Sequence, residues 1–144
     1  MNADRLRSVR VARMAGYAIK RLEHVPDMFG DDYPGEMRFL TQPLENEQVA
    51  FTYRRMTPKT GGKGSYGHRH KTQEEIYFLI SGRVQFKLDD DVVDVEGGTA
   101  VRVSPEVARS IWNDGPDDAE LVICSVRVDD PQADAEIVED FWPE

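Results

Sequence analysis

Two histidines and a carboxylate within a short stretch are the residues of this sequence best suited to chemistry. His68 and His70 are separated by one residue, and Glu75 follows after a short polar segment. In an extended strand alternate side chains point to the same face, so the two imidazoles share a face. If this strand pairs with the next one, the imidazoles and the Glu75 carboxylate converge. That is the donor set of the facial sites that hold non-haem iron and related metals.

The choice of carboxylate needs an argument because Glu74 and Glu75 are adjacent. Glu75 is in phase with Tyr77 and Leu79 in the apolar run that follows, so these three side chains share one face of a strand. Glu74 falls in the turn before that strand and is expected to face solvent. Tyr77 would then line the space around the histidines, either as part of its wall or as a catalytic acid in contact with a bound substrate.

Short strands separated by turns are predicted along most of the chain, because apolar and polar residues alternate between clusters of turn-forming residues. The clearest alternation places Val84, Phe86 and Leu88 on one face of a strand. The other strands are expected at 17–22, 36–40, 48–56, 75–80, 92–95, 100–103, 109–112 and 120–128. Either face of the segment 48–56 could point inward. No segment shows convincing helical amphipathicity, so the pattern predicts an all-β, antiparallel sandwich or barrel.

The composition fits one acidic domain with a core of its own. The chain has 144 residues, of which 40% are hydrophobic, a formal net charge of −9 and an isoelectric point near 4.8. A protein this acidic is poorly suited to bind nucleic acid. No apolar run is as long as a membrane helix and no secretory signal is evident, so we expect a cytoplasmic protein without a membrane partner. The single cysteine, Cys124, is expected in a buried strand.

Five residues with fixed spacing resemble the first sequence motif of the cupin family. They are Gly62, His68, His70, Glu75 and Gly82. The second cupin motif is matched only at its two ends, Gly98 and Asn113. Its internal proline, glycine and histidine are replaced by Ser104, Glu106 and Arg109. The resemblance covers roughly residues 62–113 and is similar to small, uncharacterised bacterial cupins. It implies a single-domain antiparallel jelly-roll β-barrel over residues 17–128 and leaves the substrate open.

Arg109 is the departure from the family pattern with the largest consequence. In metal-binding cupins this position carries a histidine that is the fourth protein ligand, whereas a guanidinium group has only donors and cannot coordinate a cation. Either His68, His70 and Glu75 hold a metal without that ligand, or Arg109 takes the place of the metal and pairs with Glu75. In a third arrangement the metal is kept and Arg109 turns towards a substrate carboxylate or phosphate.

Two functional hypotheses follow. In the first, an iron, manganese, zinc or nickel ion on His68, His70 and Glu75 activates a small anionic substrate for oxygenation or isomerisation, with Arg109 and Tyr77 binding the substrate. In the second, a metal-free barrel binds a small acid or sugar without catalysis, with Arg109 as the anchor. The residues leave both open.

The two ends of the chain and one strand face bear on assembly. Residues 1–16 are predicted to form a flexible basic segment, and residues 129–144 an acidic C-terminal tail. Ile76, Phe78 and Ile80 form an apolar stripe on the face opposite Glu75, which the terminal segments or a second subunit must cover. Since cupins commonly dimerise through such faces, we expect a symmetric homodimer.

Overall fold

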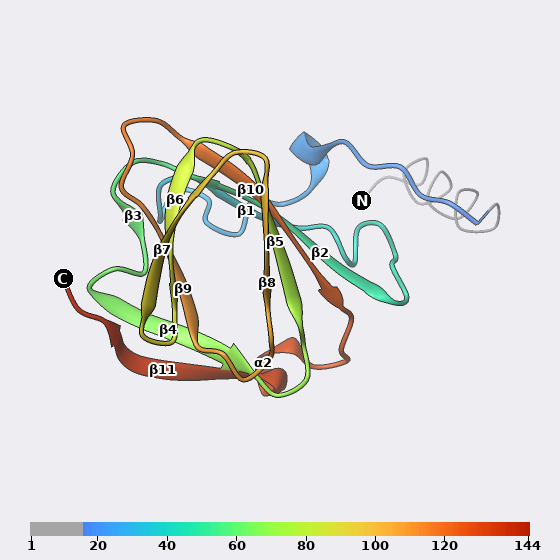
Figure 1. Cartoon of the computed structure of the whole chain (residues 1–144). Helices are drawn as coiled ribbons and strands as arrows, with labels where there is room; N and C mark the ends of the chain where they lie inside the picture. The colour runs from blue at the N-terminus through green and yellow to red at the C-terminus, as the bar shows by residue number, and fades with distance from the viewer. Residues whose placement is uncertain (1–15) are drawn as a thin grey trace.

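The protein is built from two antiparallel sheets that face each other (Figure 1). The structure, a computed structural model, describes residues 16–144. The five-stranded sheet contains, in spatial order, β1 (Glu36–Phe39), β2 (Val49–Met56), β10 (Ala119–Val126), β5 (Glu75–Ser81) and β8 (Thr99–Val103). The six-stranded sheet contains β11 (Ala135–Trp142), β4 (Ser65–His70), β9 (Arg109–Asn113), β6 (Arg83–Leu88) and β7 (Asp91–Glu96), with β3 (Thr60–Gly61) paired to β9. The prediction of an all-β antiparallel jelly-roll barrel is confirmed.

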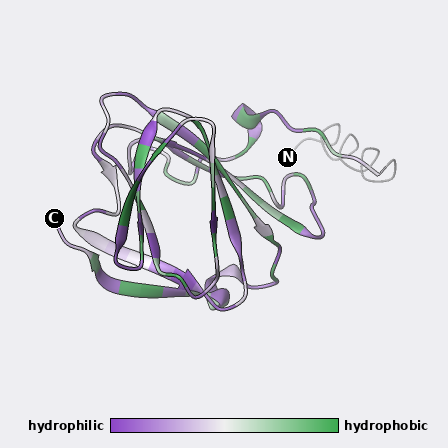
Figure 2. Ribbon diagram, viewed as in Figure 1, coloured by the Kyte–Doolittle hydropathy of each residue, from purple (hydrophilic) through white to green (hydrophobic). Residues whose placement is uncertain are grey.

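The main core lies between the two sheets and follows the period-two pattern of the sequence. Short alternation of hydrophobic and hydrophilic residues is visible along the strands in Figure 2. Leu79 of β5, Phe86 of β6 and Ile111 of β9 meet in this core, and the ring of Tyr77 packs edge-on against Phe86 with 5.3 Å between centroids. Gly82 joins β5 to β6 with φ 82°, a conformation that glycine adopts without strain, which accounts for the closing glycine of the motif.

The strand expected at 17–22 is absent, and this prediction is wrong. The segment is irregular and ends in a short 3-10 helix, η1 (Leu22–His24). Only Leu22 of the segment packs on the outer face of the five-stranded sheet, against the second cluster formed by Val25, Leu40 and Tyr53. Tyr17 and Ile19 are 59% and 81% exposed, so the apolar residues that suggested a strand are mostly not buried.

The C-terminal residues do not lie apart from the barrel as a tail. After the short helix α2 (Pro131–Asp134), β11 pairs antiparallel with β4, so that Ile137 is opposite His68. Trp142 at the end of β11 is 5% exposed, so this end of the chain packs against the barrel. The many acidic residues at 129–144 suggested a tail. The backbone N–H and C=O groups of β4 need partners on both sides of the strand, and β11 supplies those on one side. The predicted basic segment 1–16 lies outside the described residues apart from Gly16.

The outer face of β5 carries the predicted apolar stripe. Ile76, Phe78 and Ile80 are 45%, 41% and 47% exposed, while Tyr77 and Leu79 on the inner face are buried. The second cluster, around Val25, Leu40 and Tyr53, covers β2 and part of β10 on this side of the sheet and leaves the stripe on β5 exposed. No helix among residues 16–144 has the length and apolar character needed to cross a membrane.

Candidate metal centre

The predicted ligands converge, but not through the pairing that the sequence suggested. β4 and β5 belong to different sheets, so His68 and His70 face Glu75 across the barrel. The turn at 71–74 carries the chain from one sheet to the other. Nε2 of His68 lies 3.6 Å and Nε2 of His70 3.3 Å from Oε1 of Glu75. The expectation that the histidine strand pairs with the glutamate strand is therefore wrong, since the same convergence arises from two facing sheets.

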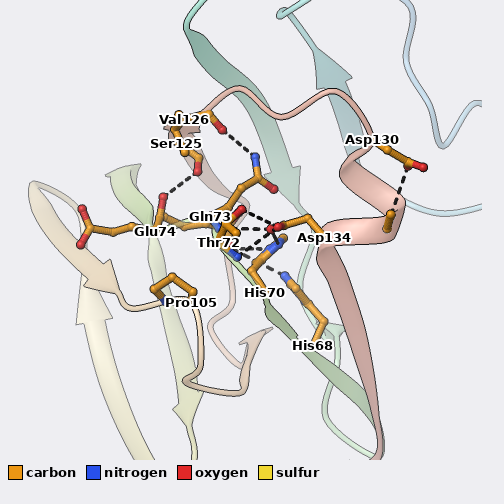
Figure 3. A network of polar contacts seen from close by, with 12 residues as sticks. His68, His70, Thr72, Gln73, Glu74, Pro105, Ser125, Val126, Asp130 and Asp134 are labelled. Atoms are coloured by element: carbon orange, nitrogen blue, oxygen red, sulfur yellow. Dashed lines mark hydrogen bonds and ion pairs between the residues drawn. The ribbon is translucent and has the colours of Figure 1, made fainter.

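His70 is held in one orientation by a carboxylate from far along the chain. Its Nδ1 lies 3.1 Å from Oδ2 of Asp134, the last residue of α2 (Figure 3). In the tautomer that donates Nδ1–H to this carboxylate, the Nε2 lone pair is directed at the cluster, as a metal ligand requires. His70 is 9% exposed and Asp134 7%, so little water competes for this contact.

Asp134 also fixes the turn between the two motif strands. Its Oδ1 accepts hydrogen bonds from the backbone N–H and the hydroxyl of Thr72, and its Oδ2 accepts one from the backbone N–H of Gln73 (Figure 3). The Gln73 amide in turn donates to the carbonyl of Val126. One carboxylate thus positions His70 and the start of the strand that carries Glu75.

Glu75 is kept ionised by its neighbours. Burial raises the pKa of its carboxyl, but the interactions with His68, His70 and Tyr77 outweigh burial and hold the pKa well below its ordinary value. The Tyr77 hydroxyl donates to Oε1 at 2.7 Å. Burial and the negative charge of Glu75 raise the pKa of Tyr77 well above its ordinary value, so the phenol keeps its proton and remains a donor.

Arg109 lies beside the cluster and is fully buried. It is paired in register with His68 on the neighbouring strand, and its Nε is 3.6 Å from Oε1 of Glu75. The terminal nitrogens point away from Glu75. They donate to three consecutive backbone carbonyls, those of Val103 at the end of β8 and of Ser104 and Pro105 in the loop that follows. The side chain therefore ties this loop to the site.

The donor set and its surroundings fit a divalent metal ion. One ligand atom each of His68, His70 and Glu75 can be chosen so that all lie within 4.8 Å of one another. Nε2 of His70 is buried and forms no hydrogen bond, although buried polar atoms usually have a partner. A metal ion coordinated by Nε2 would be that partner. The carboxylate behind His70 is the usual arrangement around a metal-binding imidazole. The buried cation of Arg109 opposes the metal, although its charge is offset by Glu75.

The structure brings all five sequence-predicted site residues together, while their roles stay predictions. Glu74 is exposed and paired with Arg102, as expected of a turn residue. Sequence reasoning missed Asp134, because it lies sixty-four residues after His70 within a run of acids. The Asp-Pro pair at 130–131, which begins a capped helix, was the one local sign that this run is not a plain tail.

Comparison with known proteins decides the family. A model described as the cupin domain matches residues 54–125. The chain belongs to the cupin family. An uncharacterized protein of Methanocaldococcus jannaschii is 33% identical over 58 residues, which is 40% of this chain. The cupin described here spans 46% of the length of that relative.

Solved structures agree on the fold. A cupin-superfamily sugar phosphate isomerase from Silicibacter pomeroyi superposes with a TM-score of 0.66 and 15% identity, covering 88% of this chain and 96% of that one. A predicted oxalate decarboxylase from Thermotoga maritima superposes with a TM-score of 0.62 and 21% identity, covering 77% of this chain and 100% of that one. A cupin 2 conserved barrel domain protein from Salinispora arenicola superposes with a TM-score of 0.61 and 15% identity, covering 77% of this chain and 89% of that one. At these identities the likeness concerns the fold.

Proposed function

We propose that this cupin holds one divalent metal ion on His68, His70 and Glu75 and acts there on a small anionic molecule. The observation that carries the proposal is the buried Nε2 of His70, which forms no hydrogen bond and is held 3.3 Å from Oε1 of Glu75 by the contact of Nδ1 with Asp134. Iron, manganese, zinc and nickel all accept this donor set. The reaction class we favour is oxygenation or isomerisation.

Each neighbouring residue has a role around the ion. When bound, the metal supplies a Lewis acid with open coordination positions. Tyr77 donates to one lone pair of Glu75 Oε1 and leaves another for the metal. Arg109 offsets the charge of Glu75, so the charge of the ion remains uncompensated by the protein, and this favours an anionic ligand. The 35% exposed side chain of His68 marks the side from which a ligand reaches the cluster.

Metal binding is tested by measuring metal content and affinity. We expect elemental mass spectrometry to find one divalent ion per chain in the purified protein. Metal-stripped protein should bind one ion again in calorimetric titrations. His70→Ala should abolish this binding, whereas His24→Ala, which removes a histidine 61% exposed and remote from the cluster, should not. Equal binding by both variants, or none by the wild type with any of the four metals, would reject the proposal.

A metal-free binding protein is the second candidate, and one observation favours it. The Arg109 guanidinium already lies at ion-pair distance from Glu75, so the carboxylate has a cationic partner without any metal. Binding of a small acid or sugar to stripped protein, unchanged by added metal and by His70→Ala, would establish this candidate.

Oxygen uptake by iron-loaded protein in the presence of a ligand would establish the oxygenase class.

A further inference from the structure

Arg54 of β2 points into the barrel, on the face that the sequence left undecided. Arg54 is opposite Leu121, and Leu121 is opposite Leu79, so the three side chains form one row across the five-stranded sheet. Directly opposed residues share a face of an antiparallel sheet. Because Leu79 and Leu121 are core residues, Arg54 faces the interior.

The guanidinium of Arg54 has no acidic partner among residues 16–144. Its Nε is buried without a hydrogen bond, the residue is half-buried, and no hydrogen bond to another described residue is found for its terminal nitrogens. The ionisable groups within electrostatic reach are the phenols of Tyr33, Tyr66 and Tyr77. Burial lowers the pKa of Arg54, although an arginine still carries its proton at neutral pH. The side chain therefore presents an uncompensated positive charge.

The surroundings of Arg54 connect it to the metal cluster. Tyr66 precedes His68 by two residues and shares its face of β4, on the sheet opposite β2 (Figure 1). Tyr66 is 55% and Tyr33 38% exposed, and the ring of Phe29 lies 5.9 Å from the guanidinium carbon. Arg54 and Leu79 are two strands apart, roughly 10 Å, and Tyr77 is the next inward residue on β5. Tyr77, which donates a hydrogen bond to Glu75, is thus a common neighbour of Arg54 and the cluster.

We infer that Arg54 binds the anionic end of a two-ended ligand, whose other end carries oxygen atoms for the metal. This rests on the proposed function and replaces Arg109 as the substrate anchor, since the terminal nitrogens of Arg109 are taken by backbone carbonyls. An unpaired, partly buried cation costs stability, and a carboxylate or phosphate removes that cost by accepting two charge-assisted hydrogen bonds. The ligand class is a small hydroxy acid with a second carboxylate or a phosphate.

The test compares Arg54→Ala with Arg102→Ala by calorimetry on manganese-loaded and on stripped protein. Arg102 lies on β8 of the same sheet but on the outer face, opposite Ile76, with its side chain 61% exposed. The probes are lactate, with one carboxylate, malate and 2-hydroxyglutarate, with two, and 3-phosphoglycerate. Wild type and Arg102→Ala should bind at least one two-ended probe about 10-fold or more tighter than lactate. The preferred probe shows whether carboxylate or phosphate is bound.

Arg54→Ala should weaken the preferred probe about 10- to 100-fold and leave lactate unchanged. Its melting temperature and manganese affinity should equal those of the wild type or exceed them, since no described carboxylate loses a partner. Equal affinities of Arg54→Ala and wild type for every probe, or no preference over lactate in the wild type, would overturn the inference. Failure of the wild type to bind iron, manganese, zinc or nickel would reject the proposed metal centre instead, and the stripped-protein titrations would still decide the role of Arg54.

Discussion

At the scale of single residues, the site depends on how charges are shared around one oxygen atom. Oε1 of Glu75 lies near both imidazoles, the Tyr77 hydroxyl and the Nε of Arg109. The sequence grouped these residues correctly through the spacing of the cupin motifs and the alternation of strand faces, although it treated the histidine and glutamate strands as neighbours. It did not predict where the arginine directs its terminal nitrogens, since that depends on the path of the loop at 103–105.

Removing Asp134 should loosen metal binding. Asp134→Ala deletes the acceptor that fixes the ring of His70, so we expect about 10- to 100-fold weaker metal affinity by calorimetry. Asp130→Ala is the matched control, because Asp130 caps the same short helix through Ala133 and does not contact His70. Equal losses in the two variants would show that the helix, and not the imidazole contact, sustains the site.

Replacing Arg109 should have opposite effects on stability and on metal affinity. Arg109→Met leaves a buried carboxylate without its cation and three carbonyls without a donor, so we expect the free energy of unfolding of metal-free protein to fall by about 3 kcal/mol. Metal affinity should rise about 10-fold, because a neighbouring positive charge is removed. Denaturant unfolding and calorimetry measure the two effects, and a fall in both would contradict this account.

At the scale of elements, strand positions were easier to predict than strand partners. Alternation of side chains located β2, β5, β6 and β9 within a residue or two, but alternation is a local property and carries no information about pairing. The histidine and glutamate strands thus seemed to be neighbours, although they lie in facing sheets. Asp134 was missed for the same reason, since its role depends on β11 returning to the edge of β4.

The pairing of β1 with β2 includes a charged contact that should make stability depend on pH. Glu36 accepts hydrogen bonds from Arg38 at 2.7 Å and Arg55 at 3.1 Å, and the bond from Arg38 chiefly lowers its pKa below the ordinary 4.5. A lowered folded-state pKa gives stability that is present above 4.5 and is lost as pH falls through the folded pKa.

Glu36→Gln should therefore cost about 1 kcal/mol at pH 7, and the difference from wild type should shrink as pH falls from 4.5. Urea unfolding at several pH values measures the difference. Glu74→Gln is the control, because Glu74 forms a single contact to Arg102 with both side chains more than half exposed. A difference that does not vary with pH would mean that the charge of Glu36 contributes nothing to the strand pair.

At the scale of the whole molecule, the uncovered stripe on β5 remains the basis for expecting a homodimer. A second copy would cover Ile76, Phe78 and Ile80 while leaving the barrel interior untouched, because these side chains point away from the site. The cytoplasmic location expected from the sequence also stays a prediction.

Sedimentation tests the dimer. We expect the wild type to behave as twice its mass of 16.4 kDa, and Phe78→Gln to shift the population towards monomer by removing a central apolar contact. Ile137→Gln, which changes an apolar residue 57% exposed on the other sheet, should leave the assembly unchanged. A monomeric wild type, or equal dissociation of both variants, would show that the stripe is not the contact.

The separation of sixty-four positions between His70 and Asp134 in the sequence has a consequence for biosynthesis. A chain leaving the ribosome exposes the three proposed ligands before the carboxylate that orients His70 has been made. In the proposed metal centre, an ion that binds at that stage would meet flexible ligands, which favours whichever metal binds imidazole most strongly. Selective loading would then require that β11 has paired with β4, so the order of synthesis would delay the choice of metal until folding is complete.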